Sequence, residues 1–206
     1  MLTLVTGELS NADFPQLVDA ATRELIAGRT DTIARLFTAI ESPVPTTRWD
    51  PAAETLDSDR LRFLLEVWRE GSSEGRLPSS RSIDPMRLAP ALGYVMLLEP
   101  VDGAANGAAN GATDFRYRVY GSIIAEHSGI EMTGKRVRDL PSAPVAVYLL
   151  ATYRAVCLTR RPMFAHHTTH YDIQIAEWSR LILPFVADDG TVDRLLVGNV
   201  PSLRSA

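Results

Sequence analysis

The amino-acid sequence predicts an α+β fold in which helices cover one face of a five-stranded antiparallel sheet, with an extra helical segment at the N-terminus. One observation is the order of the patterns: helices, two strands, a helical block and then three strands. Runs of strands separated by a helical block are typical of an antiparallel sheet covered by helices. The other is an apolar stripe along a helix at residues 145–156, which needs a sheet to cover it.

Residues 1–55 form the predicted N-terminal extension. Apolar residues recur at helical spacing over residues 14–25 and again over 33–40, which indicates two amphipathic helices. Three prolines then indicate that residues 41–55 are a linker, because proline donates no hydrogen bond and disfavours helix in the residue before it. The apolar strip of these helices packs either on the protein's own core or on a partner, including a second copy.

The second predicted unit, residues 56–206, contains the sheet. A helix capped by Asp57 or Ser58 opens it and ends near Gly71. The helical block consists of a short helix that begins at Ser122 and a long helix that begins near Pro144. Strands are predicted at the following residues: 94–98, 115–120, 164–175, 178–186 and 194–200. Residues 103–112 repeat Gly-Ala-Ala-Asn and are predicted to be a loop without chemistry.

Composition excludes several classes of function. The net charge of −4 gives no basic field for nucleic acid. Cys157 is the single cysteine, so the sequence offers neither an intrachain disulfide nor a thiolate metal cluster, and a cytoplasmic location is the simplest expectation. No uncharged apolar run approaches the ~20 residues that span a bilayer, and no secretion signal opens the chain. Phosphate-binding glycine loops and Gly-x-Ser-x-Gly elbows are absent from the sequence.

Histidines are the candidate catalytic or metal-binding residues. His166 and His170 share one face of a predicted strand but lie ~13 Å apart at ~3.3 Å per residue, while His167 points to the other face. We therefore expect a partly exposed polar strand face, with metal binding or pH sensing as the alternative. His127 lies beside Glu126 and is a candidate base, although sequence cannot show whether its partners converge.

A cavity between sheet and helices is the candidate binding site. Strand alternation and the stripe of the long helix predict these inward-facing residues: Phe115, Tyr117, Val119, Tyr148, Leu149 and Thr152. Most aromatic residues at regular spacing fill a core. Buried hydroxyl groups need partners, however, and a ligand can supply one.

Four segments of the sequence resemble the bacterial PAS-like family, whose members are often stand-alone domains. They are residues 76–85 (Arg-Leu-Pro-Ser followed by Ile-Asp-Pro), 115–121 (Phe-Arg-Tyr-Arg-Val-Tyr-Gly), 129–134 (Gly-Ile-Glu-Met-Thr-Gly) and 178–184 (Trp-Ser-Arg-Leu-Ile-Leu-Pro). The resemblance covers roughly residues 56–201. It implies the PAS fold, with a strand pair, a helical crossover and three further strands, and it implies sensing or protein interaction. It supplies no catalytic residues.

These observations together predict a non-catalytic sensory or adaptor domain without a cofactor. The resemblance implies that the domain binds a small molecule or a protein. It does not extend over residues 1–51, where periodicity alone predicts helices through which a signalling partner or a homodimer could bind. PAS domains that bind haem commonly take a histidine from the long helix, and those that form flavin adducts carry an Asn-Cys-Arg-Phe type signature; this sequence has neither. One alternative is a small enzyme or metal-binding protein that uses His127 or residues 166–170. The other is a purely structural interaction module with a filled core.

Overall fold

The computed structural model describes residues 13–73, 75–101, 114–168 and 175–203. The predicted loop at residues 103–112 and the candidate His170 lie outside these residues. Within them, no helix is long and apolar enough to cross a membrane. The helices are α1 (Phe14–Ile26), α2 (Asp31–Ala39), α3 (Asp59–Glu70), α4 (Ser122–Ser128) and α5 (Ala143–Thr159). The strands are β1 (Thr46–Trp49), β2 (Val95–Val101), β3 (Asp114–Tyr120), β4 (Met163–His167), β5 (Ile175–Val186) and β6 (Val192–Leu203).

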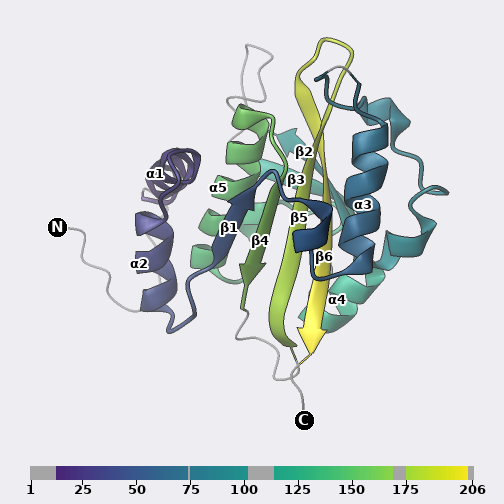
Figure 1. Cartoon of the computed structure of the whole chain (residues 1–206). Coiled ribbons are helices and arrows are strands. Elements are labelled where there is room, and N and C mark those ends of the chain that lie inside the picture. The colour runs from purple at the N-terminus through teal and green to yellow at the C-terminus, as the bar shows by residue number, and fades with distance from the viewer. Residues whose placement is uncertain (1–12, 74, 102–113, 169–174, 204–206) are drawn as a thin grey trace.

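The strands form one antiparallel sheet in the order β1-β4-β5-β6-β2-β3 (Figure 1). The predicted α+β class and the five predicted strands are therefore confirmed, but the strand predicted at residues 164–175 ends at His167, and Ile175 belongs to β5. The sheet gains a sixth strand, β1, from the segment predicted to be a linker. The prolines flank this strand and do not interrupt it: Pro43 and Pro45 precede it and Pro51 follows it. Its four residues pair with β4, from Thr46 opposite His166 to Trp49 opposite Met163.

Helices cover both faces of the sheet, whereas the sequence analysis expected them on one. Helices α1, α2 and α5 contribute to one apolar cluster, and α3 contributes to a second cluster on the opposite face (Figure 1). The reason lies in strands such as β5, where Leu181, Leu183 and Phe185 join the second cluster and Ile182 joins the first. Strands that are apolar on both sides need a layer on each.

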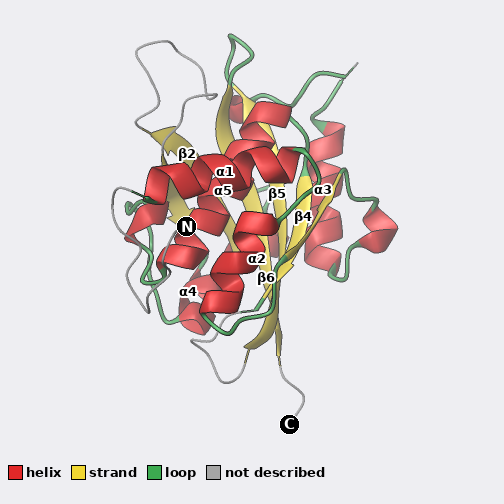
Figure 2. Cartoon of the chain, turned by 90° about the vertical axis from the view of Figure 1, so that its left-hand side faces the viewer, coloured by secondary structure: helices red, strands yellow, loops and turns green. Residues whose placement is uncertain are grey.

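Helix α5 lies between the sheet and the N-terminal helices, and all of its residues from 146 to 153 are buried. Figure 2 shows α1 and α2 lying over α5. Their apolar faces contribute Val18, Leu25 and Phe37 to the cluster that α5 shares with the sheet. An ion pair of 2.6 Å between Arg154 on α5 and Asp19 on α1 joins the helices further. The amphipathic strip therefore packs on the protein's own core, and this apolar face is not free for docking.

The second cluster depends on a close approach of α3 to β6 at Gly198. A Cβ atom at this position would lie 2.6 Å from side-chain carbons of both Leu61 and Leu64, which are fully buried. Because buried leucines in a packed core cannot move freely, an added methyl group here forces strain into the interface.

We therefore expect Gly198→Ala to lower the free energy of unfolding by about 1–3 kcal/mol, measured by urea denaturation. Leu64→Val serves as the matched variant, because it shortens one of the two obstructing side chains. The double variant should lose less stability than the sum of the two single variants. Strict additivity of the two losses would contradict a contact between Leu64 and residue 198.

Candidate functional site

A bulge in β3 determines which side chains face the layer formed by α5. Val119 pairs with Leu97 and Tyr117 with Leu98, so Arg118 is an extra residue on the β3 side of the ladder. An extra residue reverses the alternation of side chains beyond it. Tyr117 therefore faces inward before the bulge, and Tyr120, rather than Val119, faces inward after it.

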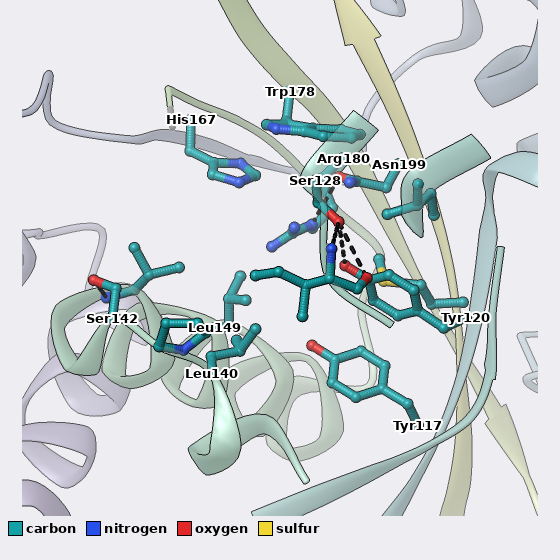
Figure 3. Close-up of a pocket in the computed structure, with 15 residues that line it drawn as sticks. Tyr117, Tyr120, Ser128, Leu140, Ser142, Leu149, His167, Trp178, Arg180 and Asn199 are labelled. Carbon is teal, nitrogen blue, oxygen red and sulfur yellow. Dashed lines mark hydrogen bonds between the residues drawn. The ribbon is translucent and has the colours of Figure 1, made fainter. Parts of the chain in front are cut away.

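A cavity of about 70 Å³ lies between this face of the sheet and the start of α5 (Figure 3). This volume is several times the ~10–15 Å³ that a cavity needs to hold one water. Its wall is mostly apolar, and its polar side chains come from the sheet and from the ends of α4 and α5. The lining residues are Met96, Tyr117, Tyr120, Ile124, Ser128, Ile130, Leu140, Pro141, Ser142, Val145, Leu149, His167, Trp178, Arg180 and Asn199.

Strand pairing places four of the polar and aromatic residues side by side on the sheet. His167 on β4 lies opposite Trp178 on β5. Arg180 follows two residues later on the same face of β5, and it lies opposite Asn199 on β6. Figure 3 shows His167, Trp178 and Arg180 on one side of the cavity, with Leu149 and Ser142 across from them. These residues lie together because β4, β5 and β6 pair in this register.

Arg180 is a buried cation with few partners. The residue is only 5% exposed. Its Nε donates a hydrogen bond of 3.1 Å to Oδ1 of Asn199. Its Nη1 is buried and has no hydrogen-bond partner. Among the described residues, the structure shows no carboxylate paired with it. Arginine stays protonated in proteins, so a positive charge faces the cavity.

His167 is also buried, at 3% exposed, and its Nδ1 has no hydrogen-bond partner. Burial lowers the pKa of His167 well below its usual value. Electrostatic interaction with Arg180, and to a lesser degree with His166, lowers this pKa further. The imidazole is therefore neutral at neutral pH and offers one N–H donor and one acceptor. Burial likewise raises the pKa of Tyr117 and of Tyr120, so both remain neutral phenols.

Comparison with known proteins agrees with this architecture. The family described as "PAS domain" matches residues 56–199. This chain belongs to the PAS domain family. The match confirms the resemblance found in the four sequence segments, and it shows that the chain carries a sensory signalling domain of this family.

One solved structure similar to the chain is described as "Structure of an RNA-binding Light-Oxygen-Voltage Receptor". The TM-score is 0.42 and the sequence identity 12%, and the alignment covers 92% of this chain and 60% of the receptor chain. The chain thus spans less than two thirds of that receptor chain's length. Among curated proteins, no match to the chain was found.

Two of the six predicted pocket residues line the cavity of the PAS domain, namely Tyr117 and Leu149. Phe115, Tyr148 and Thr152 are buried but do not line it. The Thr152 hydroxyl donates to the carbonyl of Leu149 at 2.8 Å, so it needs no ligand. The orientation predicted for Val119 was wrong, because the bulge leaves this residue 42% exposed.

The hydroxyl of Tyr148 is buried and has no hydrogen-bond partner. Its ring lies 5.8 Å from that of His167 and 5.5 Å from that of Phe37 on α2. Burial raises the pKa of Tyr148 strongly. The Tyr148 ring therefore lies between His167, which lines the cavity, and Phe37 on the N-terminal helix α2.

The histidine strand is more buried than expected. His166 and His167 point to opposite faces, as the alternation predicted, but His167 is buried, so the expectation of a partly exposed polar strand face was wrong for that residue. His166 lies on the α3 side, where its Nδ1 is 3.5 Å from Oε2 of Glu177 and its Nε2 is 3.7 Å from Oδ2 of Asp57.

Ser179 belongs to the same group of residues, but its geometry does not activate a nucleophile. Its hydroxyl donates to Asp57 at 2.6 Å and lies 3.3 Å from His166. An activated serine would donate instead to an imidazole that acts as the base. No three histidine, cysteine or acidic side chains in the described part of the chain are grouped so as to hold a metal ion.

The remaining candidate, His127, and the single cysteine both lie apart from the cavity. His127 is half-exposed on α4, and the structure shows neither a hydrogen bond nor an ion pair for it among the described residues. Cys157 is buried in α5, where burial raises the pKa of its thiol to about 12. A buried thiol with a raised pKa is a poor nucleophile at neutral pH.

Sequence reasoning missed Arg180, Trp178, Asn199 and Tyr120 as cavity residues. A signal for Arg180 was present, since it is the charged residue on a strand face whose other residues, such as Trp178 and Ile182, are apolar. A charged residue on the buried face of a strand is rare unless it is paired. The position of Asn199 opposite Arg180 depends on register, which the sequence does not show.

The lowered pKa of His167 predicts a loss of stability on acidification. Unfolded His167 takes up a proton below about pH 6.5, whereas folded His167 does not, so stability falls as pH falls, with a slope of at most about 1.4 kcal/mol per pH unit. We expect His167→Gln to remove this component of the pH dependence, measured by urea denaturation at several pH values. Leu158→Gln, at an exposed position on α5, is the control and should keep the wild-type slope because it removes no titratable group. An unchanged slope in the His167 variant would contradict a buried neutral imidazole.

Proposed function

We propose that this PAS domain is a sensory module that binds a small molecule in the cavity between its sheet and α5, without catalysing a reaction. The observation that carries the proposal is the pair of unpartnered polar atoms, Nη1 of Arg180 and Nδ1 of His167, on a cavity with apolar walls. Buried polar atoms normally have partners, and ligand sites combine apolar walls with a few convergent polar groups.

The proposal favours binding over the enzymatic alternative because of where the reactive groups lie. The hydroxyl of Ser179 donates to a carboxylate, and His166 faces the opposite side of the sheet from the cavity. His127 and Cys157 do not line the cavity. The groups that do line it can bind and orient a ligand, but none is placed as an activated nucleophile.

A route for the signal follows from the packing of α5. Val145 and Leu149 line the cavity, while Arg154 on the same helix pairs with Asp19 on α1. A ligand that shifts α5 would therefore shift the N-terminal helices. Because their inner faces are buried, we propose that a protein partner, including a second copy, binds their outer faces.

We expect a substitution that fills the cavity to abolish ligand binding. Leu149→Phe adds ring atoms to the cavity wall, and overpacking of this kind costs about 1–3 kcal/mol of stability. Butanoate and butanamide are suitable small probes, and binding can be followed through the indole N–H signal of Trp178 by NMR. The chain has three tryptophans, so Trp178→Phe assigns this signal.

Leu158→Phe is the matched control, because Leu158 lies on the same helix but is exposed and does not line the cavity. It should bind the probes as the wild type does. If neither probe shifts the Trp178 signal of the wild type, and no small molecule is found with the purified protein by native mass spectrometry, the cavity is not a ligand site. The filled-core interaction module would then be the better description.

The homodimer proposal predicts that reversing charges on the outer faces of α1 and α2 weakens self-association. Arg23 and Arg35 are exposed on these helices and lie away from the cavity. We expect the double variant Arg23→Glu and Arg35→Glu to raise the dissociation constant of the dimer, measured by analytical ultracentrifugation. A wild-type chain that stays monomeric at all accessible concentrations would refute the homodimer and leave a different protein as the partner.

A further inference from the structure

The cavity carries a net positive charge. Arg180 is charged, and none of the other lining residues is an aspartate or a glutamate. An unpaired charge in a poorly solvated site costs several kcal/mol unless an anion compensates it. The hydrogen bond that the guanidinium donates goes to the neutral amide of Asn199. The charge is therefore uncompensated by the described part of the protein.

The donors around the cavity suit a planar anion. Guanidinium groups bind carboxylates through two parallel N–H donors, and the free Nη1 of Arg180 provides one side of such a fork. Asn199 holds Nε, which fixes the orientation of the group. His167, with its unpartnered Nδ1, is neutral and can donate a second hydrogen bond from its protonated nitrogen.

The remaining wall of the cavity favours a ligand whose uncharged part is apolar. Opposite the polar side lie Ile124, Val145 and Leu149, which offer only aliphatic contacts. The volume of about 70 Å³ suits a ligand with a short chain. A dianion such as phosphate would meet only one full positive charge, and it has no apolar part to contact the aliphatic wall.

We propose that the ligand of this PAS domain is a small monocarboxylate with a short apolar chain, whose carboxylate pairs with Arg180 and whose chain contacts the aliphatic wall. This inference rests on the proposed function and specifies the chemical class that the cavity takes. It explains the buried guanidinium without a protein carboxylate, because the ligand itself supplies the counter-charge.

The experiment compares butanoate with butanamide, which has nearly the same shape but no charge. Dissociation constants are measured through the Trp178 indole N–H signal at constant ionic strength, with inorganic phosphate as a third probe. A hydrogen-bonded charge pair contributes about 1.5–3 kcal/mol, so the wild type should bind butanoate at least about tenfold more tightly than butanamide. Phosphate should bind more weakly than butanoate.

Arg180→Met tests the residue directly. Removal of an unpaired buried charge in favour of an apolar side chain should keep or raise the melting temperature of the ligand-free protein. The same variant should lose the preference for butanoate over butanamide. Arg118→Met is the matched control, because Arg118 is exposed on β3 and its guanidinium lies 3.6 Å from Glu99. It should retain the wild-type preference.

The outcomes separate this inference from the proposed function. If both probes bind equally well, the cavity is a ligand site but the assignment of a carboxylate is overturned. If phosphate binds more tightly than butanoate, the monocarboxylate is likewise overturned. Equal losses in the Arg180 and Arg118 variants would show a general effect of charge and overturn the pairing with Arg180. If neither probe binds, the proposed function fails together with the inference.

Discussion

The burial of Arg180 is the constraint on which the site depends. A buried guanidinium needs polar partners, so apolar side chains cannot fill the space around it as they fill an ordinary core. The register of β4, β5 and β6 supplies part of it by placing Asn199 opposite Arg180 and His167 nearby. The structure thus keeps a space where aliphatic side chains would otherwise have packed.

The same face of the sheet depends on a local irregularity in β3. With a regular ladder, Val119 would face α5 and Tyr120 would face the other side. The extra residue at Arg118 exchanges them, which brings the Tyr120 hydroxyl within 3.5 Å of Ser128 at the end of α4. The bulge therefore connects the strand to the helical segment that forms the rim of the cavity.

Residues 13–55 pack against the PAS domain and extend its sheet. Strand β1 extends the sheet beyond β4, and α1 covers α5 through apolar contacts and the Asp19–Arg154 ion pair. This cover explains why α5 is apolar on nearly all sides, since a helix buried all round shows no polar face. The match to the PAS family begins at residue 56, next to the boundary predicted between residues 55 and 56. Because α1, α2 and β1 pack against elements on the other side of this boundary, the division into two units stays a prediction.

The sequence by itself determined the α+β class, the five strands, the long helix and the membership suggested by four short segments, because these depend on local periodicity and on residue patterns. It also determined that His166 and His167 point apart. Only the tertiary structure decided that α3 covers the second face, that β1 joins the sheet, and that Tyr120 replaces Val119 at the cavity. It alone placed Arg180, His167 and Asn199 together. Those features depend on register, on a bulge and on packing between distant segments, and no local pattern encodes which residue of one strand meets which residue of the next.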